Sequence, residues 1–188
     1  MHPDLENLTL QFAEAEARMH RLAESVSEQE WGSRPDGGGW SMDECVAHLT
    51  LTNQRYVPIL AEASDAAPAF DTDEGPPPRL HRDLAGRMLS WMMEPPVRFK
   101  IPTRAEFMPQ GPVSRNRTVA EFDAAQAAIQ QQIRAMDGLD ITTIRVTSPF
   151  NASLRYSAYS ALHILVAHER RHLWQAERVR DQLRRKAA

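Results

Sequence analysis

Apolar residues recur every three or four positions along four long stretches of the chain, the spacing of an amphipathic α-helix. The first stretch covers residues 4–26, and the second begins at residue 42. The third covers residues 118–136 and the last covers residues 155–183. A shorter stretch with the same period covers residues 80–93. The pattern therefore predicts four long helices and one short helix, with almost no signal for strands.

Local signals predict where individual helices begin and end. Ser41 with Glu44, and Thr118 with Glu121, have the spacing of a capping box, so we expect helices to start at both places. Pro58 lies inside the second helix. Because proline removes a backbone hydrogen bond, Pro58 predicts a kink or an early end of that helix.

Two connections between the helices are long and rich in proline. Residues 64–80 form a linker, and residues 97–117 show no helical or strand period. Such a long irregular stretch in a compact domain is usually functional or poorly ordered. The sequence leaves open whether residues 97–117 cover a site, form a dimer contact, or do neither. Residues 141–146 are β-branched and predict a short extended link.

The fold class that follows is all-α: an up-and-down type four-helix bundle with an added short helix and a long irregular crossover segment. The 188 residues fit a single domain spanning residues 1–188. Hydrophobic residues make up 42% and charged residues 25%, an ordinary composition for a soluble domain.

Charge and cysteine content narrow the choice of partners and compartment. The formal net charge of −3 gives no reason to expect nucleic acid as a partner. No apolar run is long enough to span a membrane. The lone Cys45 cannot form an internal disulfide, and the N-terminus is polar. We therefore expect a cytoplasmic protein without a membrane partner.

Candidate metal ligands lie on the last helix. His168 and His172 are four residues apart, so their rings leave the same helix face about one turn apart. This spacing lets two imidazoles reach one metal ion. A third ligand has to come from another helix. His48 is the best candidate because it lies beside the apolar stripe at Leu49; His20 is a second possibility.

The segment from His168 to His172 also fits the HExxH motif of zinc peptidases, in which Glu169 would be the general base. The extended form of this motif fails, because Gln175 and Arg178 occupy the positions of its Gly and third His. No strand offers an edge for a peptide substrate. A HExxH-type zinc hydrolase is thus the weaker alternative, and we expect Glu169 to face outward or to pair with a nearby arginine.

Glu44 and Cys45 lie within one turn of His48 and could also reach the metal. We favour a structural role for both: Glu44 as the capping partner of Ser41, and Cys45 as a core residue. A fourth protein ligand from either would close the site. Three histidine ligands alone leave at least one coordination position open, as in catalytic sites.

Residues 39–49 (GWSMDECVAHL) and residues 167–175 (AHERRHLWQ) together resemble the DinB/YfiT-like superfamily. In that family a histidine of the second helix follows a Trp-Ser helix start, and the last helix carries HxxxH. The resemblance covers nearly the whole chain. It implies a four-helix bundle, often a homodimer, that binds a divalent metal through His48, His168 and His172. Characterised relatives include thiol-dependent S-transferases and isomerases, so the resemblance implies no single activity.

These features predict a metal-dependent enzyme that uses zinc or nickel to activate a low-molecular-weight thiol or a water for attack on a small electrophile. Neutral imidazoles leave the charge of the site at about +2, which favours an anionic thiolate as a further ligand. The alternative is a non-catalytic metal-binding or stress-related bundle with the same three ligands. The sequence identifies no catalytic residue beyond them.

Overall fold

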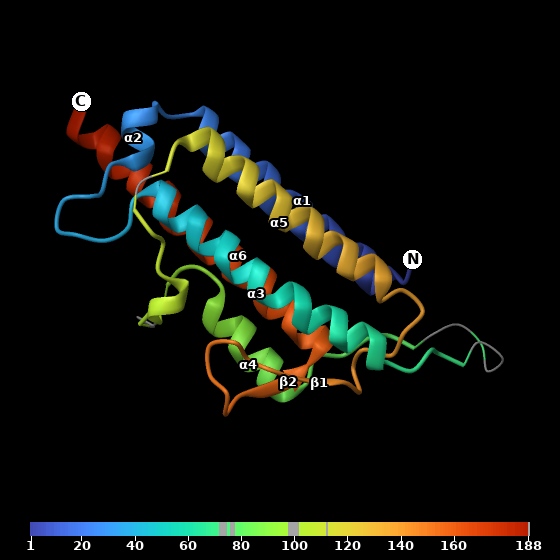
Figure 1. Ribbon diagram of the computed structural model, residues 1–188. Helices are drawn as coiled ribbons and strands as arrows, with labels where there is room; N and C mark the ends of the chain where they lie inside the picture. Colours follow the sequence, from blue (N-terminus) through green and yellow to red (C-terminus); the bar gives the residue numbers. More distant parts are fainter. Residues whose placement is uncertain (72–74, 76–77, 98–101, 112, 188) are drawn as a thin grey trace.

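Four long helices form the body of the computed structural model (Figure 1). They are α1 (Pro3–Glu24), α3 (Met42–Ala66), α5 (Arg115–Ala135) and α6 (Ala158–Ala187). A short helix, α2 (Glu28–Gly32), connects α1 to α3. The structure describes residues 1–71, 75, 78–97, 102–111 and 113–187.

The helices are arranged so that α1 and α3 each pack against both α5 and α6. In Figure 1, α1 and α6 run in one direction and α3 and α5 run in the other. The chain therefore has to cross back along the bundle between α3 and α5. This crossover contains α4 (Leu84–Met93), which packs on α6, and a single turn of 3-10 helix, η1 (Ala105–Phe107). The all-α bundle with an added short helix and a long crossover is confirmed. The helices do not alternate strictly up and down, because the crossover makes α3 and α5 run in the same direction.

A small antiparallel hairpin precedes the last helix. Strand β1 (Arg145–Thr147) pairs with β2 (Arg155–Ser157), with Val146 opposite Tyr156. The prediction that the last helix begins at residue 155 was wrong, because the backbone of residues 155–157 pairs with β1 instead. The Oγ of Ser157 accepts a hydrogen bond from the backbone N–H of Ser160 at 3.1 Å, which caps the first turn of α6.

Three other helix limits differ from the prediction. Helix α4 begins at Leu84 rather than at residue 80. Helix α3 does not end at Pro58 but continues to Ala66. Pro58 is exposed, whereas Tyr56 and Leu60 beside it are buried in the core, and this packing outweighs the loss of one helical hydrogen bond. Helix α5 begins at Arg115 rather than at Thr118. The Thr118 hydroxyl is therefore not a cap.

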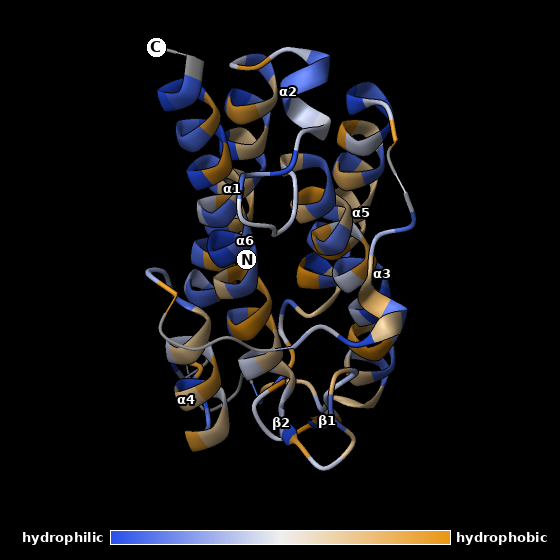
Figure 2. Cartoon of the chain, turned by 90° about the vertical axis from the view of Figure 1, so that its left-hand side faces the viewer, coloured by the Kyte–Doolittle hydropathy of each residue, from blue (hydrophilic) through white to orange (hydrophobic). Residues whose placement is uncertain are grey.

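The apolar core consists of two clusters, and Figure 2 shows hydrophobic positions alternating with hydrophilic ones along the helices. On α6, one cluster uses residues between Ala158 and Val166 and the other uses residues between Leu173 and Val179. The intervening turn of α6 contains His168, Glu169 and His172, all buried. A polar layer therefore separates the two clusters along the bundle. No helix within the described ranges is long and apolar enough to cross a membrane.

Asp83 joins α4 to the hairpin and to α6. Its carboxylate accepts hydrogen bonds from the backbone N–H groups of Gly86 at 2.7 Å and Ser157 at 2.8 Å, and from the Ser160 hydroxyl at 3.0 Å. It also forms an ion pair with Arg145. Burial by itself would raise the pKa of Asp83, but these hydrogen bonds and the arginine outweigh it and lower the pKa below the ordinary 3.8.

We expect Asp83→Ala to lower the free energy of unfolding by about 2 kcal/mol at pH 7, because it removes the helix cap and its linked hydrogen bonds. Because the pKa of Asp83 is lower in the folded state than in the unfolded state, its carboxylate stabilises the fold at pH values above the unfolded-state pKa. This stabilisation is lost as the pH falls through the folded-state pKa. The difference between wild type and variant should therefore shrink at pH 3. Urea denaturation at both pH values measures it, with the exposed Asp65→Ala as control. An equal loss at both pH values would contradict this assignment.

Candidate metal centre

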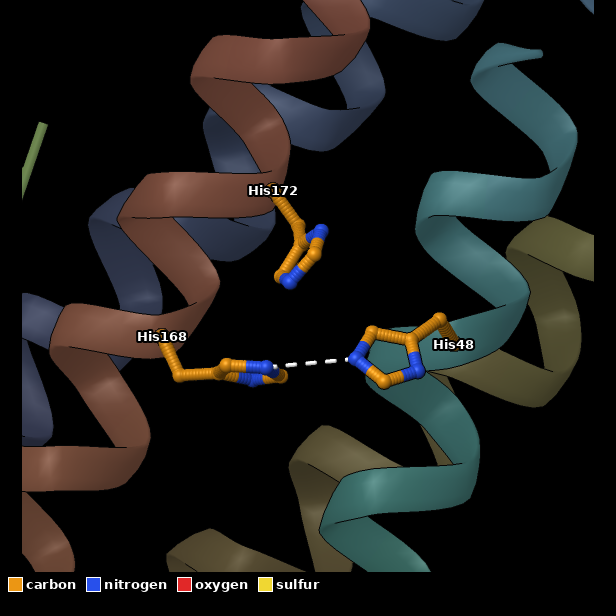
Figure 3. Close-up of side chains that lie close together, drawn as sticks. All are labelled: His48, His168 and His172. Atoms are coloured by element: carbon orange, nitrogen blue, oxygen red, sulfur yellow. Dashed lines mark hydrogen bonds between the residues drawn. The ribbon is translucent and has the colours of Figure 1, made fainter. Parts of the chain in front are cut away.

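Three histidines from two helices meet in the polar layer (Figure 3). His48 comes from α3, and His168 and His172 come from α6. The rings point toward one another, with centroids 5.0 Å apart for His48 and His168, 4.6 Å for His48 and His172, and 4.5 Å for His168 and His172. The three residues are only 2%, 7% and 8% exposed. The structure thus brings together all three predicted ligands.

The ring of His48 is oriented by the crossover segment. Its Nδ1–H donates a hydrogen bond to the backbone carbonyl of Phe107 at 2.8 Å, which leaves Nε2 free to face the centre. Histidines that bind metals usually have such a second partner, because it fixes the tautomer and the ring orientation. His48 Nε2 lies 3.2 Å from His168 Nε2. Two nitrogens bound to one zinc ion at tetrahedral angles lie about 3.3 Å apart, so this geometry fits a shared ion.

All three rings are uncharged at neutral pH. Burial lowers the pKa of His48 below its ordinary value. Burial lowers the pKa values of His168 and His172 still further. The repulsion that a protonated neighbouring ring would exert and the Arg171 guanidinium add to this effect. Neutral imidazole is the form that binds metal ions, so these environments keep the ligands ready for coordination.

Two nitrogens of the α6 histidine rings have no hydrogen-bond partner within the described part of the chain. They are Nδ1 of His168 and Nδ1 of His172, both buried. A buried polar atom without a partner costs about 1–3 kcal/mol. The nitrogen of His168 that faces His48 is Nε2, so the unpaired Nδ1 atom lies on the other side of that ring and does not itself indicate an ion at the centre.

Aromatic side chains enclose the three rings. Trp40 lies against His48 and His172, with centroid distances of 4.9 and 5.7 Å. Phe150 lies 5.9 Å from His168 and 4.3 Å from Phe107. The part of the crossover that contains Phe107 therefore covers the site, which answers the question that the sequence left open for residues 97–117. Residues 98–101 and 112 of that segment lie outside the described ranges.

Of these surrounding groups, only Trp40 carried a sequence signal, because it directly precedes the predicted helix start at Ser41. Phe107 lies in a stretch without periodicity, and it acts through its backbone carbonyl, which any residue type could supply. Phe150 belongs to a turn that is distant from the motif. No pattern in the sequence marked Phe107 or Phe150 as neighbours of the site.

Glu169 does not occupy the position that an HExxH peptidase requires. It is fully buried, and its two oxygens accept hydrogen bonds from the side-chain amides of Asn53 on α3 and Gln126 on α5, each at 2.8 Å. The expectation that Glu169 faces outward or pairs with arginine was wrong, because these amides hold it in the core. Burial raises the pKa of Glu169 to about 7, against the effect of the two hydrogen bonds. Its carboxylate is not among the atoms that cluster at the three rings.

Neither Glu44 nor Cys45 supplies a fourth ligand. The Glu44 carboxylate accepts hydrogen bonds from the Ser41 backbone N–H at 2.8 Å and from Arg34 Nε at 2.9 Å. The capping box at Ser41 is therefore confirmed. Cys45 is fully buried among apolar side chains, and burial raises the pKa of its thiol, so it stays protonated at neutral pH. Within the described residues, the histidine cluster has no fourth Cys, Asp or Glu member.

The alternative third ligand, His20, lies away from this cluster. Its Nε2 donates a hydrogen bond to Asp123 Oδ1 on α5 at 2.9 Å. The structure therefore favours His48 over His20 as the partner of His168 and His172.

The fold and this cluster define a helical-bundle protein with a candidate three-histidine metal site. The chain belongs to the DinB superfamily, since the model of that family matches residues 11–176. The matched region contains all three histidines. Comparisons with curated proteins and with solved structures find no match.

We expect the untagged wild-type protein to bind about one equivalent of zinc or nickel, and His172→Ala to lose it, because two remaining rings hold a divalent ion much less tightly than three. Mass spectrometry of metal content after dialysis measures this. His163→Ala is the matched control, since His163 lies on the same helix but packs against Tyr159. Equal metal content in wild type and His172→Ala would show that these rings do not form the site.

Proposed function

We propose that this protein is a metal-dependent enzyme that activates a low-molecular-weight thiol, as S-transferases do, or a water for attack on a small electrophile. The observation that carries the proposal is the convergence of three neutral imidazoles without a fourth protein ligand among the described residues. Such a site leaves a coordination position for a reactant. Zinc or nickel is the metal we expect, because imidazole nitrogen suits both.

The residues around the centre would each contribute to this chemistry. His48, His168 and His172 would hold the ion, and the Phe107 carbonyl keeps the ring of His48 in its binding orientation. A bound divalent ion lowers the pKa of a coordinated water or thiol and so supplies a nucleophile at neutral pH. Trp40 and the neighbouring phenylalanines exclude bulk water, which strengthens electrostatic interactions at the centre.

A thiol is the reactant we favour over water. Three neutral ligands leave the ion's charge uncompensated, so an anionic thiolate gains more from binding than a neutral molecule does. A hydrolase of the HExxH type also needs a carboxylate base at the metal, and both oxygens of Glu169 are held by Asn53 and Gln126 instead. The absence of such a base from the cluster counts against the hydrolase alternative.

A non-catalytic metal-binding bundle is the second candidate, and one observation favours it. The three histidines are at most 8% exposed. Two surface hollows of about 580 and 350 Å³ lie elsewhere, one between α1 and α6 and the other between α1 and α5. A reactant would have to approach past Trp40 and Phe150, which are only partly buried.

A cobalt-substituted protein separates the two candidates. If the protein is a thiol-activating enzyme, adding a low-molecular-weight thiol should produce a sulfur-to-cobalt charge-transfer band, and the zinc- or nickel-loaded protein should transfer that thiol to an electrophile. His168→Ala should abolish both signals, because it removes a ligand. If cobalt binds at the histidines but no thiol alters its spectrum and no transfer occurs, the thiol-activating enzyme is ruled out and the non-catalytic bundle is favoured.

We also propose that the protein is cytoplasmic, since its lone cysteine needs no oxidising compartment, and that it forms a homodimer, as the resemblance implies. Helix α4 offers a surface that fits such a contact. Leu84, Met88 and Trp91 lie on one face of α4 and are 81%, 53% and 53% exposed. Arg87 is the only charged residue of this helix. Two copies of an uncharged apolar face can pack about a two-fold axis.

We expect light scattering after size exclusion to give twice the chain mass for wild type and the monomer mass for Met88→Glu, because a carboxylate would be buried without a partner at the interface. Leu10→Glu is the control, since Leu10 is an isolated exposed residue of α1, 63% exposed. A dimer that persists in Met88→Glu would place the interface elsewhere.

A further inference from the structure

A second group of metal-ligating side chains lies on the opposite side of the bundle, where α1 packs against α5. Glu16 and His20 are four residues apart on α1, so they share one face of that helix. Asp123 faces them from α5. One ligand atom from each residue lies within 4.8 Å of the others. None of these residues belongs to the three-histidine centre, which lies between α3 and α6.

Among the described residues, His20 is the only basic side chain that contacts the two carboxylates of this group. His20 is the only described residue that bonds to the Asp123 side chain, and Glu16 has no described hydrogen-bond or ion-pair partner. Burial raises the pKa of Glu16 and the negative charge of Asp123 raises it further, while His20 lowers it by less. The two carboxylates therefore repel each other, and a cation placed between them would relieve that repulsion.

The arginines in the neighbourhood are held by other groups. Arg18 makes a two-pronged ion pair with Glu177, and Arg21 pairs with Glu14. Arg115 donates a hydrogen bond to the Ala23 carbonyl at 3.1 Å, bonds to the Val26 carbonyl, and lies 3.7 Å from Glu28. None of these contacts involves Glu16 or Asp123, so none of these three arginines occupies the position of a compensating cation.

The surroundings leave room for an ion that keeps some of its water. His20 and Asp123 line the hollow of about 350 Å³ between α1 and α5. Their side chains are 40% and 36% exposed. An imidazole with two carboxylates is a ligand set that zinc accepts, and water can fill the remaining positions.

We propose that Glu16, His20 and Asp123 form a second divalent-metal site, weaker than the three-histidine centre, which clamps α1 to α5. Without a metal, the His20 Nε2–H donates to Asp123. On binding, the ring changes to the tautomer with its proton on Nδ1, so that Nε2 becomes a ligand, and the two carboxylates share the ion. The site is open to solvent, so its ligands gain less from excluding water than the buried centre does. The second site therefore fills only after the three-histidine centre has taken up the first equivalent of metal.

Calorimetric titration of the full-length wild-type protein with zinc chloride tests this proposal. The expected result is two binding steps. Glu16→Gln and Asp123→Asn should each weaken the second step by about tenfold or more, because each removes a charged ligand. The first step should not change. Glu24→Gln is the matched control: Glu24 lies on α1 and lines the same hollow, but it is not in the cluster, so both steps should remain.

The thermal midpoint gives a second readout. Zinc beyond the first equivalent should raise the midpoint of wild type and of Glu24→Gln, but not that of Asp123→Asn. A single binding step in wild type that Asp123→Asn leaves unchanged, or a second step that neither Glu16→Gln nor Asp123→Asn weakens, would overturn the proposal. If the three-histidine centre binds no metal but the second site does, wild type and His172→Ala show the same single binding step. Asp123→Asn then loses that step.

Discussion

The burial of three uncharged imidazoles in the middle of the bundle is the constraint on which the rest of the structure depends. His48, His168 and His172 lie in a polar layer between two apolar clusters, where an unpaired ring nitrogen is costly. The clusters above and below hold α3 and α6 at the separation that lets these rings meet. The polar layer thus lowers the stability of the core, but it provides a site that can bind a cation.

Buried hydrogen bonds set the rotation of the helices around this site. Glu169 joins α6 to Asn53 of α3 and to Gln126 of α5. Asp43, also buried, accepts a hydrogen bond from the indole of Trp31 at 3.1 Å and another from the Thr118 hydroxyl. Turning any of these helices would leave a buried polar group unpaired, which costs about 1–3 kcal/mol. These contacts therefore keep His48 and the α6 histidines face to face.

The crossover between α3 and α5 is required by the directions of the helices, and it also supplies contacts to the histidine centre. Because α3 and α5 run in the same direction, the chain has to return along the bundle between them. On this path η1 passes over α3, where the Phe107 carbonyl orients His48 and the Phe107 ring packs on Phe150. The same topology places α1 beside α5, away from the histidine centre, where Glu16, His20 and Asp123 meet at the surface.

The sequence by itself determined the helices, the bundle and the pairing of His168 with His172, because helical periodicity and i, i+4 spacing are local properties. For the third ligand it favoured His48 over His20 through the apolar stripe beside His48, and the resemblance to the family implied the same residue. The sequence also placed the capping box at Ser41 correctly. Tertiary structure decided what depends on contacts between distant residues. Thr118 bonds to another helix instead of capping its own, and Glu169 is held by amides from two helices that its motif does not contain. The Phe107 carbonyl reaches His48 from 59 residues away, and a backbone carbonyl leaves no trace in the amino-acid pattern.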